Sequence, residues 1–391
     1  MKKLIVLLLT IAMVGAVFAQ TPTLSASSTL SWGWDLDTGY TGFANTNKAT
    51  ISVLFPVDNV AKKGEAGWWG EIAVKDLYFK ISDKQLTTGD ALTFTDWNDK
   101  DGDGVKDSGE YATLSAKITN GMWALSVSTW NKFDFANADA LYTGDVAVTI
   151  DADKAGTSLS YTANGLSVGV TAASKADWTA NTKNEYALGA NASYKVGDAI
   201  TVSGGVAYDA FDATKQLGGT ASIAYSAAPL TVSVATDLFY DPTPTPKTFD
   251  VDALLTVGYA VMEGLDAEAD AYYSTGDDDA EAKVAVDYAV DPIEAGIWLG
   301  VADPITAIAY DLGVYAGYTY AIDPATKLYG YAEYKNDFTG KGSLVPYVCL
   351  SNTSVTNTTL KLEYNAMPDD GGIDVLAGKY GLLKVSAKIS L

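Results

Sequence analysis

Apolar and polar residues alternate one by one along most of this chain, which is the period of a β-strand with two different faces. One clear example covers 265–273, where leucine, alanine and tyrosine alternate with Asp266, Glu268 and Asp270. The last residues, 381–391, alternate in the same way and end on an apolar residue. The pattern predicts many strands, each with one apolar and one polar face.

Short turn sequences separate these strands at regular intervals. From Asn164-Gly165 onward, tight turns fall near positions 165, 197, 229, 263, 291, 323 and 355, roughly 32 residues apart. Longer polar loops alternate with the tight turns, and short turns at one end with long loops at the other are typical of outer-membrane β-barrels. Two strands for each tight turn, with the strands at both ends of the chain added, give about twenty strands.

We therefore predict an all-β protein: a large antiparallel transmembrane β-barrel of about 16–20 strands, with short periplasmic turns and longer extracellular loops. The barrel is expected to cover 20–391, and a separate N-terminal portion over 20–155 is the open alternative. Residues 1–19, with two lysines, an apolar run and small residues before Gln20, are typical of a secretory signal peptide. After them, no window of about 18 consecutive apolar residues follows, which excludes a helical membrane protein.

Charge and composition exclude several classes of function. The formal net charge is −22, and the sequence contains neither histidine nor arginine. A nucleic-acid partner is not expected, because phosphate binding needs a concentrated basic face. Histidine-based catalytic triads and histidine metal sites are excluded as well. We expect no enzymatic activity and no catalytic residues.

The N-terminal region resembles a known family. The blocks "TLSWGWDLDTGYTGFANTNKATISVLFPV" and "EAGWWGEIAVKDLYFKI" are similar to the treponemal (spirochaete) major outer sheath protein family, and "GTSLSYTANGLSVGVTAAS" resembles it more loosely. The resemblance implies an outer-membrane β-barrel with pore-forming activity, homotrimers and adhesion to host matrix proteins. It also implies a bipartite chain with a periplasmic N-terminal portion.

The stretch "DKDGDGVKDSGE" at 99–110 spaces its carboxylates like a twelve-residue calcium loop. Its flanks have the pattern of strands, which excludes a helix–loop–helix calcium sensor. Two interpretations stay open, a calcium site on a β scaffold or an acidic surface loop without a defined ion. No other cofactor is expected. The ligands would be Asp99, Asp101, Asp103, Val105 through its carbonyl, Asp107 and Glu110.

Four acidic residues on the predicted polar face, Asp266, Glu268, Asp270 and Asp287, are expected to line the pore. Acidic rings favour cations, so the predicted function is an outer-membrane porin that passes small hydrophilic solutes and prefers cations. The alternative is a surface adhesin or structural sheath protein that binds host matrix through its loops. Aromatic residues near strand ends are expected at the membrane interfaces. A carbohydrate-stacking surface is less favoured, because the sequence shows no positioned polar partners.

Overall fold

The computed structural model describes residues 23–56, 67–79, 113–134, 138, 149–174, 186–209, 216–242, 248–276, 279–302, 309–336, 342–365 and 375–390. These ranges contain twenty strands and one short 3₁₀ turn, η2 (Val375–Ala377). No helix within them has the length and hydropathy that crossing a bilayer requires. The strands are β1 (Thr23–Asp35), β2 (Thr41–Pro56), β3 (Trp69–Phe79), β4 (Thr113–Thr119), β5 (Trp123–Asp134), β6 (Thr149–Ala163), β7 (Leu166–Ser174), β8 (Tyr186–Val196), β9 (Ile200–Asp209), β10 (Gln216–Ala227), β11 (Leu230–Asp241), β12 (Thr248–Met262), β13 (Leu265–Ser274), β14 (Asp279–Val290), β15 (Ile293–Ala302), β16 (Ala309–Ala321), β17 (Thr326–Asn336), β18 (Gly342–Asn352), β19 (Thr358–Tyr364) and β20 (Leu382–Ser390).

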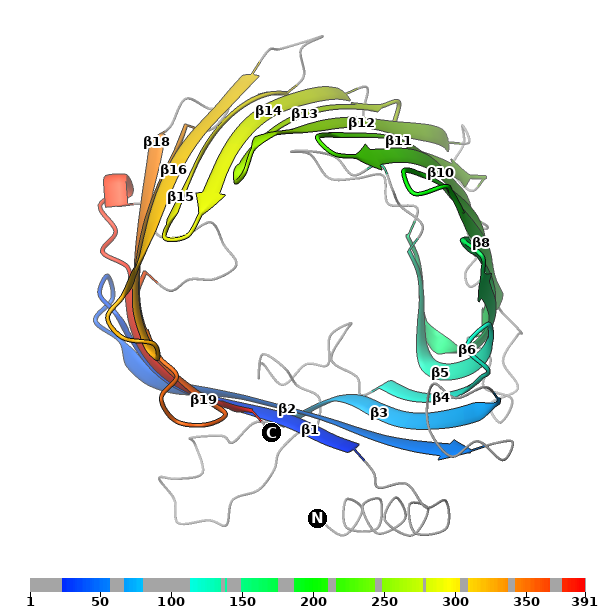
Figure 1. Ribbon diagram of the computed structural model, residues 1–391, viewed down its shortest axis with the longest axis horizontal. Helices are drawn as coiled ribbons and strands as arrows, with labels where there is room; N and C mark the ends of the chain where they lie inside the picture. Colours follow the sequence, from blue (N-terminus) through cyan, green and yellow to red (C-terminus); the bar gives the residue numbers. More distant parts are fainter. Residues whose placement is uncertain are drawn as a thin grey trace.

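Each strand pairs antiparallel with the next strand in the sequence, and β20 pairs with β1. The result is one closed sheet, seen as a ring around an open centre in Figure 1. The predicted all-β antiparallel barrel is confirmed. The described residues form twenty strands, which is the upper end of the predicted range of 16–20. Strands β1 to β6 stand in the same wall as all the others.

The closing seam joins the two ends of the chain. Residues Ser27–Asp35 of β1 pair with Leu382–Ser390 of β20. Beside this ladder, the carboxylate of Asp37 in the β1–β2 turn accepts hydrogen bonds from the backbone N–H of Tyr380 (2.6 Å) and of Gly381 (3.1 Å). A side chain near the start of the chain therefore fastens the segment that leads into the last strand.

The shortest connections, of two or three residues, all follow even-numbered strands and gather at one end of the barrel. Most connections that follow an even-numbered strand have two to five residues, and 57–68 after β2 is the longer exception. All the predicted tight-turn positions fall in these short connections. At Asn164 (φ 52°) and Gly165 (φ 78°) both turn residues have the left-handed conformation that a two-residue hairpin of type I′ requires.

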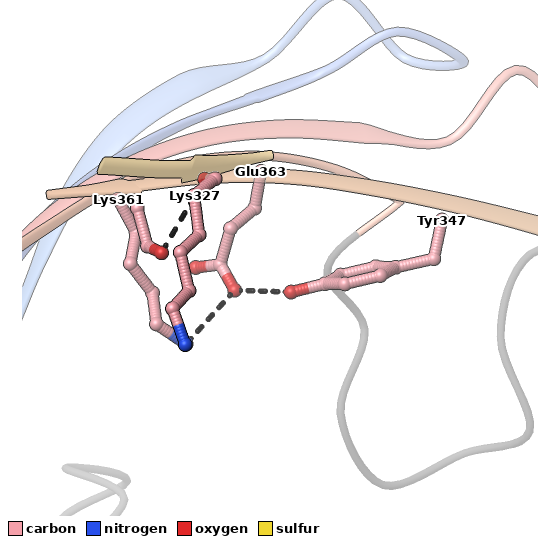
Figure 2. A network of polar contacts seen from close by, with 5 residues as sticks. Lys327, Tyr347, Lys361 and Glu363 are labelled. Carbon is pink, nitrogen blue, oxygen red and sulfur yellow. Dashed lines mark hydrogen bonds and ion pairs between the residues drawn. The ribbon is translucent and has the colours of Figure 1, made fainter. Parts of the chain in front are cut away.

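The two faces of the wall differ in chemistry. Residues paired across neighbouring strands share a face, and one face carries large, solvent-exposed apolar side chains such as Leu255, Ile297 and Val314. The other face carries most of the charged side chains. Figure 2 shows Tyr347 and Glu363 projecting from the concave side of the strands, toward the space that the barrel encloses. We call this concave face luminal.

Two sequence predictions lie outside the described residues. These are the signal peptide over 1–19 and the calcium-like loop over 99–110. They stay predictions.

Candidate functional site

The four residues predicted to line the pore lie on the luminal face of two adjacent strands. Asp266, Glu268 and Asp270 are on β13, and Asp287 is on β14. The register sets Asp266 opposite Asp287 and sets Asp270 opposite Lys283. Asp266, Glu268 and Asp287 also line one hollow at the tight-turn end of the wall. Two carboxylates directly opposite each other repel, so this part of the wall concentrates negative charge.

These four residues belong to a larger acidic wall on β11 to β16. Within the described residues, the luminal positions of these six strands carry eleven carboxylates and one lysine, Lys283. Alternation and cross-strand register assign each of them to the luminal face. The carboxylates are Asp237, Asp241, Asp250, Asp252, Asp266, Glu268, Asp270, Glu281, Asp287, Glu294 and Asp311.

Lysines gather on a different part of the wall, formed by β17 to β20 and β1 to β4. Its described luminal positions carry seven lysines and the four carboxylates Asp35, Glu71, Glu333 and Glu363. In Figure 1, β11 to β14 lie across the ring from β1 to β3 and β19. The lumen therefore has an acidic side facing a more basic side. The lysines are Lys48, Lys117, Lys327, Lys335, Lys361, Lys384 and Lys388.

One described residue lies inside the barrel without belonging to a strand. The backbone N–H of Ala138, from the connection between β5 and β6, donates to Asp237 Oδ2 on β11 at 2.9 Å. Ala138 is 1% and Asp237 is 2% exposed. Strands β5 and β11 are not neighbours in the sheet. Because Asp237 is luminal, this contact places backbone against the acidic wall on the inside.

Five aromatic side chains form a continuous band on the luminal face of β15 to β18. Ring centroids are 6.5 Å apart from Trp298 to Tyr315 and 5.7 Å apart from Tyr315 to Tyr331. They are 6.3 Å apart from Tyr331 to Tyr329 and 5.9 Å apart from Tyr329 to Tyr347. All five side chains are half-buried. We call this set the aromatic track.

Carboxylates accept a hydrogen bond from four of the five track residues. Tyr315 Oη donates to Asp287 Oδ1 at 2.6 Å, and Trp298 Nε1 donates to Asp311 Oδ2 at 2.9 Å. Tyr347 Oη donates to Glu363 Oε1 at 2.6 Å, and Lys361 Nζ lies 3.6 Å from the same oxygen (Figure 2). Tyr329 Oη donates to Glu294 Oε1. These four bonds anchor the polar ends of four of the five track side chains to the wall.

Glycines make room for the rings. Gly313 stands opposite Trp298 in the register, and a Cβ atom at Gly313 would lie 1.9 Å from the indole ring. Gly296 stands opposite Tyr315, where a Cβ atom would lie 2.4 Å from the phenol ring. The two rings therefore lie along the backbone of the neighbouring strand instead of pointing across the lumen. Sequence reasoning missed the track; the available signal was tyrosine or tryptophan at polar-face positions, with glycine on the adjacent strand.

The exterior carries two girdles of aromatic residues, one near each end of the strands. Both lie on the face opposite to the luminal one, and most of their members are exposed. The girdle at the tight-turn end contains Trp123, Tyr161, Tyr194, Tyr225, Tyr259, Tyr288 and Tyr318. The girdle at the loop end contains Tyr186, Tyr208, Tyr240, Phe249, Tyr273, Tyr310 and Tyr334.

Within the described part of the chain, no three histidine, cysteine or carboxylate side chains gather in a way that could hold a metal ion. The six predicted calcium ligands all belong to 99–110, outside that part.

No protein-family model matches this chain, and no curated protein matches it. Among solved structures, a double mutant of the porin of Rhodopseudomonas blastica is 10% identical, with a TM-score of 0.40. A triple mutant of the same porin is 11% identical, with a TM-score of 0.39. In both cases the alignment covers 95% of this chain and 100% of the other. The chain is similar to these porins in having a large β-barrel.

Proposed function

We propose that this protein is an outer-membrane porin that lets small hydrophilic solutes diffuse through its lumen and prefers cations. The observation that carries the proposal is a closed wall with an apolar outer face and a charged inner face. A soluble protein would bury the apolar face, whereas a bilayer covers it with lipid. Passage by diffusion needs no catalytic residue and no cofactor.

The distance between the two aromatic girdles supports a membrane location. Tyr186 and Tyr194 are eight residues apart on β8, and Phe249 and Tyr259 are ten residues apart on β12. At about 3.4 Å per residue, these separations are about 27 and about 34 Å along the strand. With a strand tilt of about 40°, they span about 21 to 26 Å, close to the apolar band of about 25 Å in outer-membrane barrels.

The luminal charges support cation preference. The acidic wall has eleven carboxylates against one lysine, and the opposite wall has seven lysines against four carboxylates. Across both walls the carboxylates are in excess, 15 to 8, so the potential in the lumen attracts cations.

Conductance in a planar bilayer tests the proposal. The purified chain should form ion-conducting channels, and a potassium chloride gradient should give a reversal potential of the sign that cation selectivity requires. Replacing Asp266→Asn and Glu268→Gln together should move the reversal potential toward zero. Glu263→Gln, which removes a carboxylate from the adjoining turn instead of the wall, should change it much less. Absence of channels would overturn the porin assignment, and an anion-selective channel would overturn the cation preference.

Adhesion to host matrix and trimer formation follow from the family resemblance alone and stay predictions. Calcium binding at 99–110 also stays a prediction.

A further inference from the structure

We propose that the aromatic track on β15 to β18 is a binding surface for neutral oligosaccharides that pass through the barrel. This inference rests on the proposed porin function and adds a substrate class to it. It depends on four features of the track: the continuity of its rings, their orientation, the hydrogen-bonding groups that border them and the ion pairs beside them.

The track is continuous over four adjacent strands. Successive rings from Trp298 to Tyr347 are 5.7 to 6.5 Å apart. A linear oligosaccharide that moves along the track would therefore reach the next ring before it loses contact with the previous one. A hexose ring has an apolar face of C–H groups that packs on an aromatic ring. A row of such contacts suits a linear sugar polymer better than a single small solute.

The rings are presented to the lumen by one face. Trp298 and Tyr315 lie over Gly313 and Gly296, which places one face of each ring against the wall. The hydrogen bond from Trp298 Nε1 to Asp311 restrains rotation of the indole ring, and the bond from Tyr315 Oη to Asp287 anchors the phenol oxygen. A surface of fixed orientation loses little conformational entropy when a ligand binds, which favours binding.

Hydrogen-bonding groups border the rings. Asp287, Glu294 and Glu363 each accept a hydrogen bond from a track tyrosine at one oxygen. A carboxylate has two oxygens with about four acceptor positions, so each keeps acceptor capacity for a sugar hydroxyl. Lys335 and Lys361 beside the track are donors for hydroxyl oxygens. These are the positioned polar partners that the sequence alone did not reveal.

The charges beside the track favour a neutral ligand over a cation. Lys335 Nζ lies 3.2 Å from Glu333 Oε1 and 5.7 Å from the centroid of the Trp298 ring. Lys361 forms the corresponding pair with Glu363. A free cation would compete with these two lysines, and an anionic sugar would meet the carboxylates. A neutral oligosaccharide avoids both penalties.

Titration with maltohexaose and cellohexaose tests the proposal. Two readouts are measured on the full chain: reduction of channel conductance in a planar bilayer, and quenching of intrinsic tryptophan fluorescence in detergent. At least one of the two sugars should give a saturable effect. Tyr331→Ala removes the central ring and should weaken the apparent affinity by about tenfold. Tyr331→Phe keeps the ring and should bind nearly as well as the wild type.

The control is Phe239→Ala, which removes an aromatic side chain from the luminal face of β11, away from the track. It should leave sugar binding unchanged. If Tyr331→Ala does not fold, as judged by the heat-dependent shift in gel mobility, Tyr347→Ala tests the end of the track instead.

If the wild-type channel conducts but shows no saturable sugar effect, the proposed sugar binding by the track is wrong and the porin function still stands. Sugar binding by the track would also be refuted if Phe239→Ala and Tyr331→Ala weakened the apparent sugar affinity equally. Saturable block by spermine without any sugar effect would refute it as well. Fluorescence titration without conductance would support the track and refute the pore.

Discussion

At the scale of single residues, a glycine decides whether a luminal ring lies flat on the wall. A Cβ atom at Gly313 would lie 1.9 Å from the Trp298 ring, whereas a Cβ atom at Gly330 on the next strand meets nothing within 4 Å. Gly313→Ala should therefore destabilise the barrel by about 1 to 3 kcal/mol, the usual cost of overpacking. Gly330→Ala should be neutral or slightly stabilising. Unfolding of both variants in guanidinium measures the difference, and equal midpoints would contradict it.

A carboxylate in a tight turn outside the strands makes a pH-dependent contribution to the free energy of unfolding. Asp323 Oδ1 accepts hydrogen bonds from the backbone N–H of Ala325 and of Thr326, both at 2.8 Å. These bonds favour the ionised form and lower the pKa of Asp323 from its ordinary value. The stabilisation is therefore complete above that ordinary value and is lost as the pH falls through the lowered pKa.

Asp323→Asn tests this contribution, because asparagine keeps an acceptor oxygen but does not titrate. The wild type should be slightly more stable than the variant at about pH 6, and the difference should shrink toward about pH 2. The effect is small because Asp323 is fully exposed. A difference that stayed constant over this range would assign the turn's stability to its backbone alone.

Single residues on the two faces differed in how well the sequence predicted them. The acidic residues Asp266, Glu268 and Asp270 interrupt an apolar run at every second position, so their placement on one polar face was readable. Tyr315 and Tyr331 lie on that same luminal face, but tyrosine is compatible with either face. Only the cross-strand register assigns each tyrosine to its face: it pairs Tyr315 with Glu333 on the luminal face, and the girdle residue Tyr318 with Ile293 on the outer face.

At the scale of elements, the seam between β1 and β20 decides whether the sheet closes. Ala387 is central in β20 and pairs with Leu30 on one side and with Leu360 on the other. Ala387→Pro removes a ladder hydrogen bond in the middle of the seam. We expect this variant to fail to close the barrel. Gel mobility without heating should then equal the mobility after heating, whereas Ala387→Val should keep the shift. A closed barrel with proline at this position would show that the seam tolerates a missing bond.

Hairpins were predictable from the sequence because each depends on local chemistry. Asn164 and Gly165 adopt left-handed conformations that few other residues accept, and a glycine or a proline stands at most of the other tight turns. The seam is different. Its partners, Ser27–Asp35 and Leu382–Ser390, lie at opposite ends of the sequence. Alternation shows that both are strands, but it does not state which strand each one pairs with.

At the scale of the whole molecule, the division into an apolar outer face and a charged luminal face determines where the other features lie. The charge distribution between two luminal walls follows from closure, because only the ring sets β11 to β14 across from β1 to β3 (Figure 1). The sequence predicted acidic pore residues but not this opposition. Charges far apart in the chain become opposite walls only when the order of strands is known.

Two neighbouring residues of β12 test this division directly. Leu255 is 41% exposed on the outer face, roughly midway between the girdle residues Phe249 and Tyr259. Thr256 is luminal, and it pairs with Ser233 on one side and with Asp270 on the other. Leu255→Lys places a charge near the bilayer midplane and should destabilise the barrel by about 2 to 4 kcal/mol. Thr256→Lys places the same charge in the lumen beside Asp270 and should be tolerated.

Guanidinium unfolding in lipid vesicles measures both variants. Repeating it in detergent micelles separates the lipid contribution, since a thinner and softer apolar layer penalises the outer lysine less. The two lysines differ by one position in the chain, so local strand propensity cannot explain a large difference between them. If both variants were equally stable in vesicles, Leu255 would not face lipid. The outer surface of the barrel would then have to be covered by protein instead of membrane, and the proposed pore would lose its physical basis.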